Sequence, residues 1–144
     1  MKVLVLNGPN LNMLGKREPS IYGQQTYKDL VAFIKKVGKE QQCKIKVRQS
    51  NKESYLIDCV QKADLKYDYV LLNAGGYTHT SVALADAIKC CAIPVIEVHL
   101  SDVDNREEFR KINYIRPNCL KSFTKKGFNS YKDAILFIVE REVK

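Results

Sequence analysis

The 144-residue sequence contains no tryptophan and only two histidines, His79 and His99. Its cysteines are odd in number and form no CxxC pair; they are Cys43, Cys59, Cys90, Cys91 and Cys119. Two histidines and this cysteine spacing cannot supply the ligand pattern of a zinc site. We therefore expect reduced, mostly buried thiols and no bound metal.

Long apolar runs are also missing. No segment approaches the roughly 18 apolar residues that a membrane helix needs. No leader with a basic start, an apolar core and a small-residue end precedes KVLVLN at residues 2–7. These absences lead us to expect a cytoplasmic protein that has no membrane partner.

The sequence lacks the common nucleotide-binding motifs. Neither GxxxxGK[ST] nor GxGxxG occurs, and no hydroxyl-rich loop of the kind that holds a flavin phosphate follows the first apolar run. We therefore expect no nucleotide or flavin cofactor, although a flavodoxin-like electron carrier remains an alternative.

Positive charge is in excess, because 24 Lys and Arg stand against 16 Asp and Glu, a formal net charge of +8. Such an excess favours an anionic partner, either nucleic acid or a small acidic metabolite. The lysines occur as dispersed pairs, aromatic residues do not interleave with them, and no helix-turn-helix signature is present. We expect no nucleic-acid partner, and a basic nucleic-acid-binding module remains the alternative.

Apolar, β-branched runs alternate with helical stripes along the chain, and no linker or repeat divides it. The predicted strands are residues 2–7, 43–49, 69–73, 94–100 and, more weakly, 119–123. Helical spacing predicts helices after the capping box of Thr26 and Asp29, around residues 56–63, after Ser81, from Asp104 through 106–109, and around residues 134–139. This alternation predicts one α/β domain over residues 1–144, with a parallel sheet covered on both faces.

Polar clusters follow three of these strands, where parallel sheets bind their ligands. They are the long loop 7–23, the segment NAGGYTHTS at 73–81, and EVHLS at 97–101. Both histidines lie in these clusters. Each polar residue could also serve only as turn or helix-cap chemistry. Their convergence on one end of one sheet is what indicates a site.

Two pairs of residues suggest acid–base chemistry. Glu97 and His99 are two apart on a predicted strand and so point to the same face. A carboxylate beside an imidazole fixes its tautomer and favours the protonated ring, as a general acid requires. Tyr22 would act as a base only as a phenolate, which Arg17 could favour. A packing role for Tyr22 and a solvated Arg17 remain the alternative interpretation.

Several segments together resemble the type II 3-dehydroquinate dehydratases, the type II dehydroquinases of the shikimate pathway. They are LNGPNLNMLGKREPSIYG, RQSN, LID, NAGGYTHTSVALADA, IPVIEVHLSD and REEFR, which lie in order within residues 3–110. The resemblance implies a flavodoxin-like, three-layer sandwich with five parallel strands in the order 2-1-3-4-5. It also implies dehydration of 3-dehydroquinate to 3-dehydroshikimate by anti elimination through an enolate, with no metal or cofactor.

The resemblance also implies catalytic roles. Tyr22 would abstract the proton α to the ketone, with Arg17 promoting its phenolate and stabilising the transition state. Asn12 would support the enolate oxygen through water. His99, oriented by Glu97, would protonate the departing hydroxyl.

Binding roles follow from the same match. Asn73, His79 and Arg110 would bind substrate hydroxyls, while Ser101 and the backbone at Leu100 would hold the substrate carboxylate. Asp86 matches a family residue that reaches a neighbouring subunit's site. The resemblance thus implies a homo-oligomer, and members of this family are typically dodecamers.

The sequence departs from the family's pattern after residue 110. The family usually continues with a His-Ser or similar pair and with a GxGxxGY segment entering the last helix. Here the sequence is KINYIRPNCLKSFTKKGFNSYKDAILF, in which only Gly127 and Tyr131 match. A non-catalytic relative that binds an anionic ring compound, or serves as an assembly scaffold, therefore stays a further alternative.

Overall fold

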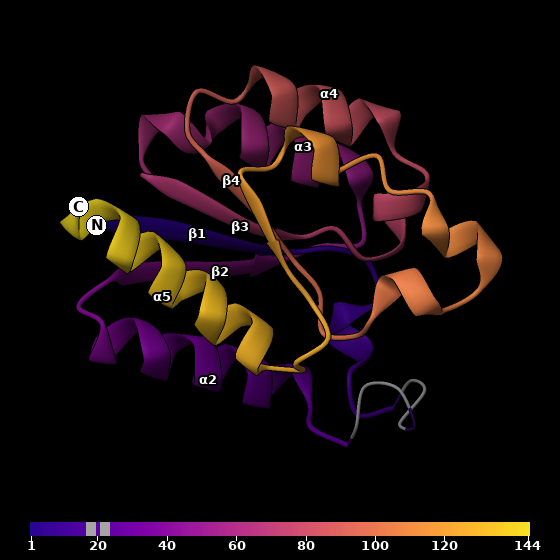
Figure 1. Ribbon diagram of the computed structural model, residues 1–144, viewed down its shortest axis with the longest axis horizontal. Helices are drawn as coiled ribbons and strands as arrows, with labels where there is room; N and C mark the ends of the chain where they lie inside the picture. The colour runs from indigo at the N-terminus through magenta and orange to yellow at the C-terminus, as the bar shows by residue number, and fades with distance from the viewer. Residues whose placement is uncertain (17–19, 21–23) are drawn as a thin grey trace.

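A five-stranded parallel sheet forms the centre of the protein, in a computed structural model that describes residues 1–16, 20 and 24–144 (Figure 1). The strand order is β2-β1-β3-β4-β5, as the resemblance implied. The strands are β1 (Lys2–Asn7), β2 (Lys44–Gln49), β3 (Tyr69–Asn73), β4 (Val95–Val98) and β5 (Lys121–Phe123). All five predicted strands are therefore confirmed, with β4 and β5 shorter than predicted.

Helices cover both faces of this sheet, which confirms the predicted three-layer α/β fold. They are α2 (Tyr27–Glu40), α3 (Glu53–Lys62), α4 (Val82–Cys90) and α5 (Asn129–Val143). Figure 1 shows α2 and α5 on one face and α3 and α4 on the other. Both chain termini lie at the end of the sheet opposite the loops that follow β3 and β4 (Figure 1).

Two apolar clusters form the core, one on each face of the sheet. Val3 and Val5 of β1 pack toward α2 and α5, whereas Leu4 and Leu6 pack toward α3 and α4. This division follows from the strand geometry, because successive side chains of a strand point to opposite faces. Each fully buried Val or Leu contributes about 1.5–3 kcal/mol of hydrophobic stabilisation. The continuous apolar run of β3 (Tyr69–Asn73) is buried along its whole length, as a central parallel strand requires.

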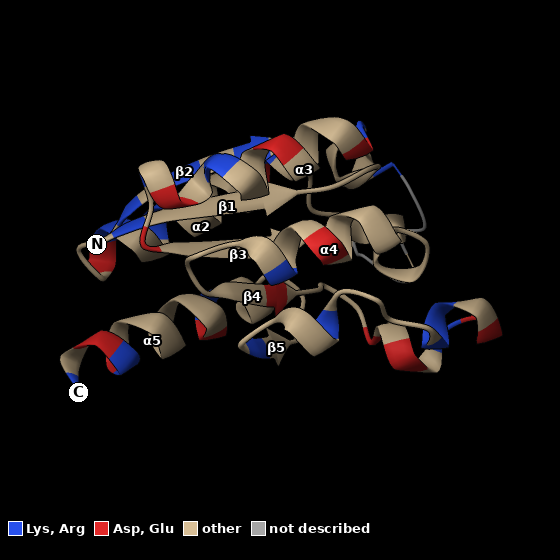
Figure 2. Cartoon of the chain, turned by 90° about the horizontal axis from the view of Figure 1, so that it is seen from above, with Lys and Arg blue, Asp and Glu red and all other residues tan. Residues whose placement is uncertain are grey.

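Strand β2 lies at an edge of the sheet and alternates exposed with half-buried residues. Figure 2 shows basic residues gathered on β2, whereas the neighbouring β1 and β3 are almost free of charge. Charged side chains on an edge strand discourage pairing with another chain. The three basic residues of β2, Lys44, Lys46 and Arg48, therefore belong to a solvated edge.

Two predicted helix starts are confirmed at the level of hydrogen bonds. The Thr26 Oγ1 accepts a hydrogen bond from the Asp29 backbone N–H at 3.2 Å, and the Asp29 carboxylate accepts from the Thr26 N–H at 3.0 Å. The Ser81 Oγ accepts from the Leu84 N–H at 2.9 Å at the start of α4. Caps of this kind contribute about 1 kcal/mol each.

The short helix predicted from Asp104 through 106–109 is wrong. Two separate 3-10 turns, η4 (Val103–Asn105) and η5 (Glu108–Lys111), occupy this region instead. The reason is local, because Arg106 has the extended backbone angles φ −99° and ψ −151° and interrupts any helix. Among the described residues, no helix has both the length and the apolar character needed to cross a membrane.

Substitution of Gly8, directly after β1, tests how closely the end of β1 approaches the end of β3. A Cβ at this position would lie 2.6 Å from the Ala74 carbonyl oxygen, a backbone atom that cannot easily move. We expect Gly8→Ala to lower the free energy of unfolding by about 1–3 kcal/mol in denaturant titrations. Gly76→Ala is the matched control, because a Cβ there meets nothing within 4 Å. Equal stabilities of the two variants would contradict this close approach.

Candidate active site

The loops that follow the carboxyl ends of the central strands form a small, partly open cleft. Six of the residues predicted from the sequence line it together: Asn73, His79, His99, Leu100, Ser101 and Arg110. Among the described residues, the rest of the lining consists of Leu11, Gly75, Gly76, Val103 and Arg106. The convergence expected at this end of the sheet is therefore present in the folded chain.

Other predicted residues lie outside the lining of this cleft. Asn12, on the turn η1 (Leu11–Met13), is exposed, and its side-chain oxygen accepts a hydrogen bond from Gln49 at 3.3 Å. Asp86 is exposed on α4. Arg17 and Tyr22, predicted as the activating cation and the base, lie outside the described residues.

Glu97 on β4 and His99, one residue beyond the end of that strand, form a hydrogen-bonded pair. The Nε2 of His99 lies 2.8 Å from the Glu97 Oε2, and both side chains are buried. A carboxylate only accepts hydrogen bonds, so Nε2 carries a proton. The other ring nitrogen, Nδ1, is then the one that can bond a ligand in the cleft. The strand ends one residue before His99, but the hydrogen bond shows that the two side chains lie on the same side, as predicted.

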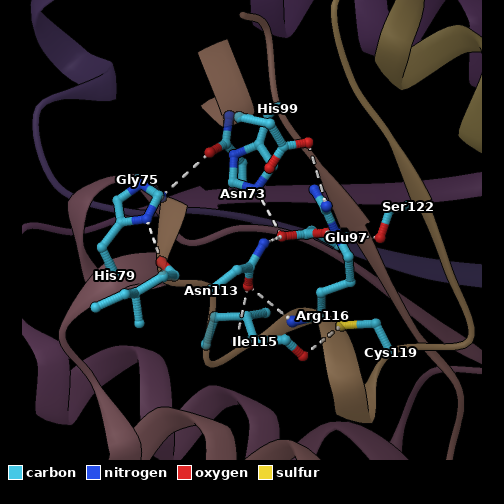
Figure 3. A network of polar contacts seen from close by, with 12 residues as sticks. Asn73, Gly75, His79, Glu97, His99, Asn113, Ile115, Arg116, Cys119 and Ser122 are labelled. Carbon is cyan, nitrogen blue, oxygen red and sulfur yellow. Dashed lines mark hydrogen bonds and ion pairs between the residues drawn. The ribbon is translucent and has the colours of Figure 1, made fainter. Parts of the chain in front are cut away.

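Four donors surround the Glu97 carboxylate, which has no exposed surface (Figure 3). The Oε2 accepts from His99 and, at 2.7 Å, from the Asn113 amide, while the Oε1 accepts from Arg116 at 2.7 Å and from Ser122 at 2.6 Å. Burial alone would raise the pKa of Glu97, but the hydrogen bonds and charges of these partners hold the pKa well below its usual range. Glu97 is therefore an anion at neutral pH.

His79 is held by a different kind of partner. His79 is the last residue of the turn η3 (Gly75–His79), and its Nδ1 donates a hydrogen bond to the backbone carbonyl of Ile112 at 2.7 Å. Burial lowers the pKa of His79, the bond to Ile112 opposes this, and the nearby charge of Arg110 lowers it further. A neutral His79 with a proton on Nδ1 leaves Nε2 as an acceptor for a ligand hydroxyl.

Asn73 is fixed in place by a buried tyrosine from α5. The Tyr131 hydroxyl accepts a hydrogen bond from the Asn73 amide at 2.9 Å and donates to Asn7 at 2.6 Å. The Asn73 oxygen accepts from the Gly75 N–H at 3.2 Å. Burial raises the pKa of Tyr131 far above its usual value, so its hydroxyl stays protonated. One phenol thus joins the carboxyl ends of β1 and β3.

Several functional residues were missed in the sequence. Asn7 could have been found, because it is the strand-end counterpart of Asn73 and pairs with it in register. Arg106 could also have been found, since it lines the cleft with Arg110 and opens the segment REEFR. For Asn113, Arg116 and Ser122 the sequence carries no periodic or motif signal.

The cleft offers cations rather than metal ligands. Arg106 and Arg110 line it beside the two histidines, a set that suits an anionic ligand. Within residues 1–16, 20 and 24–144, no group of three His, Cys, Asp or Glu side chains is arranged to hold a metal ion.

Fold and cleft together define a flavodoxin-like α/β protein whose site supports general acid–base chemistry on a small, hydroxylated anion. Comparison with known sequences agrees. The sequence model of the family described as Dehydroquinase class II matches residues 1–139. The chain belongs to the class II dehydroquinase family.

Individual relatives support this assignment over nearly the whole chain. The 3-dehydroquinate dehydratase of Rhizobium johnstonii is 54% identical over 129 residues, covering 90% of this chain and 89% of that protein. The corresponding protein of Fusobacterium nucleatum is 46% identical over 143 residues, with 97% of each chain covered. The crystal structure of type II dehydroquinase from Butyrivibrio crossotus superposes with a TM-score of 0.93 at 42% identity, covering 96% of this chain and 97% of that one.

The lowered pKa of His79 gives a test of its environment. Because the folded-state pKa lies below the unfolded value, the unfolded chain binds a proton first as the pH falls, and stability decreases below about pH 6.5. His79→Asn keeps a donor for the Ile112 carbonyl but does not titrate. We expect its free energy of unfolding to fall less steeply between about pH 7 and 5 than that of the unsubstituted protein. The difference should not exceed about 1.4 kcal/mol per pH unit.

Urea titrations at each pH measure these free energies of unfolding, and the pH range above neutrality serves as the control. There His79 is neutral in both states, so the two proteins should show parallel pH dependence. Parallel curves below pH 6.5 as well would mean that folding does not perturb this ring.

Proposed function

We propose that the protein dehydrates 3-dehydroquinate to 3-dehydroshikimate. The observation that carries this proposal is the buried anion Glu97, whose partner His99 lines a cleft together with Arg106, Arg110 and Ser101. An imidazole backed by an anion is a suitable proton donor to a leaving hydroxyl. Membership of the class II dehydroquinase family supports the same substrate and reaction.

The proposed reaction moves two protons and expels one water. The Tyr22 phenolate removes the proton α to the ketone, and the electron pair of that C–H bond forms an enolate. The enolate then re-forms the ketone as the C–O bond to the β-hydroxyl breaks. His99 gives its Nδ1 proton to the departing oxygen, which leaves as water. Arg17 favours the phenolate, and Asn12 stabilises the enolate oxygen through a water molecule.

Substrate binding in this proposal divides between anion and hydroxyl contacts. Ser101 and the backbone at Leu100 hold the carboxylate at the end of β4. Asn73, His79 and Arg110 bind the hydroxyls of the ring. The neutral His79 Nε2 supports this assignment, because it can accept a hydrogen bond from a hydroxyl.

We also propose that residues 1–144 act as one catalytic domain, that the protein is a cytoplasmic dodecamer, and that Asp86 contributes to a neighbouring subunit's site. The exposure of Asp86 on α4, outside the cleft of its own chain, supports a contribution across an interface. The five cysteines are free thiols, which favours a reducing compartment.

The activity is tested by ultraviolet absorbance after purified protein is added to 3-dehydroquinate. Formation of the conjugated enone is expected with the unsubstituted protein. In Tyr22→Phe we expect the rate to fall by about 10²–10⁴-fold, because a phenyl ring cannot accept the proton. Tyr55→Phe, on α3 and outside the cleft lining, is the matched control and should keep the full rate.

Each outcome of this assay has a distinct meaning. Absence of enone with folded protein would overturn the proposed reaction in favour of a binding or scaffold role. Equal rates for Tyr22→Phe and the unsubstituted protein would keep the reaction but reject the base.

The intersubunit role of Asp86 is tested by complementation. Asp86→Ala and His99→Asn subunits should each be nearly inactive alone. Mixed by co-refolding, they should regain activity, because a mixed interface combines an intact His99 with an intact Asp86 from its neighbour. No regain in mixed oligomers would contradict a contribution across the interface. Light scattering on the unsubstituted protein measures the number of subunits.

A further inference from the structure

The Glu97 carboxylate depends on a segment in which the sequence departs from the family's pattern. Each of its oxygens has two donors: His99 and Asn113 bond Oε2, while Arg116 and Ser122 bond Oε1 (Figure 3). Three of these donors come from the divergent residues after 110. Only His99 belongs to the motifs that carry the family resemblance.

Arg116 supplies the positive charge in this set. Its guanidinium Nε lies 2.7 Å from the Glu97 Oε1, at the start of the turn η6 (Arg116–Asn118). Its outer nitrogen is 3.4 Å from Asp104, a partly exposed carboxylate. The side chain therefore bridges a buried anion to one at the surface, and it is not among the residues that line the cleft.

Asn113 builds the turn that presents this arginine. Its side-chain oxygen accepts hydrogen bonds from the backbone N–H groups of Ile115, at 3.0 Å, and Arg116, at 2.9 Å. Its amide nitrogen donates to Glu97. One side chain thus fixes both the backbone that carries Arg116 and the carboxylate that Arg116 binds.

We propose that Arg116 is a positioning residue for catalysis, which keeps Glu97 ionised and reserves Oε2 for the imidazole of His99. A fully buried carboxylate without a cation would be strongly destabilised and would take up a proton more readily. A protonated Glu97 no longer offers His99 an anionic acceptor. This inference rests on the proposed function, in which His99 delivers the proton to the leaving group.

Other titratable groups also face the Glu97–His99 pair. They are His79 on η3, Arg106 and Arg110 from the turns after β4, Asp104 on η4, and Cys119 after η6. Burial and then the charge of Glu97 raise the pKa of the Cys119 thiol to about 12, so it is uncharged at neutral pH. Of the described lysines and arginines, Arg116 is the one that bonds Glu97 directly.

The test compares Arg116→Met with Arg116→Lys and with Asp104→Asn. In Arg116→Met we expect kcat to fall about tenfold, the usual scale for a partner that orients an active-site group, while KM stays unchanged. Arg116→Lys keeps the charge and should restore most of the rate. Asp104→Asn removes the surface contact of Arg116, leaves Glu97 its four donors, and should keep wild-type kinetics.

A second measurement does not require turnover. Carboxyl ¹³C resonances of labelled glutamate, with Glu97 assigned from Glu97→Gln, report the pH at which each carboxyl is protonated. The Glu97 titration should move upward by about one pH unit or more in Arg116→Met, and not in Asp104→Asn.

These measurements separate the two proposals. Wild-type kcat and an unmoved Glu97 titration in Arg116→Met would overturn the role of Arg116, whatever the reaction is. A tenfold loss of kcat without any movement of the Glu97 titration, unrescued by lysine, would also overturn it. A wild-type protein without activity, combined with a shifted Glu97 titration in Arg116→Met, would instead overturn the proposed function and keep the ion pair.

Discussion

The ionised Glu97 carboxylate, with no surface exposed to water, is the constraint that organises this end of the protein. Removing an ion from water costs several kcal/mol, and only a complete set of close partners offsets that cost. The four described donors to Glu97 come from the residue directly after β4, the loop before η6, η6 itself and β5. Satisfying one charge therefore requires the edge strand β5 and the irregular segment before it to take defined positions. The site and the outer part of the sheet are built together.

A second polar contact plays the corresponding role between the central strands. Asn7 and Asn73 end adjacent strands in register, and the buried Tyr131 hydroxyl bonds both. Unpaired, these amide groups would each carry a desolvation penalty of about 1–3 kcal/mol. The helix α5, the last element of the chain, thereby orients Asn73 at the cleft, although Tyr131 and Asn73 are 58 positions apart in the sequence. The Tyr131 hydroxyl oxygen thus links the packing of α5 to the geometry of the cleft.

The sequence predicts best what depends on neighbours along the chain. The runs that form β1 and β3, and the caps at Thr26 and Ser81, were recoverable because burial, period and capping are local properties. The strand order came only from the family resemblance, since local patterns do not specify which strands become neighbours. Arg116 reaches Glu97 over 19 positions, through a turn with no regular period, so no local pattern could associate them. The helix predicted from Asp104 failed because one extended residue, Arg106, ends η4 and separates it from η5.

The two histidines of the cleft differ because their partners differ. Both are held by one ring nitrogen, His79 through Nδ1 to a backbone carbonyl and His99 through Nε2 to a carboxylate. Either partner fixes the tautomer, but only the carboxylate brings a negative charge that stabilises an imidazolium. The ring of His79, with its pKa lowered first by burial, therefore presents a lone pair to the cleft, whereas that of His99 is equipped to present a proton. Hydrogen-bond partners that differ in this way assign acceptor and donor roles to the two rings within one small site. The assignment depends on Glu97 remaining an anion, so the residues that hold its charge determine which histidine can act as the acid.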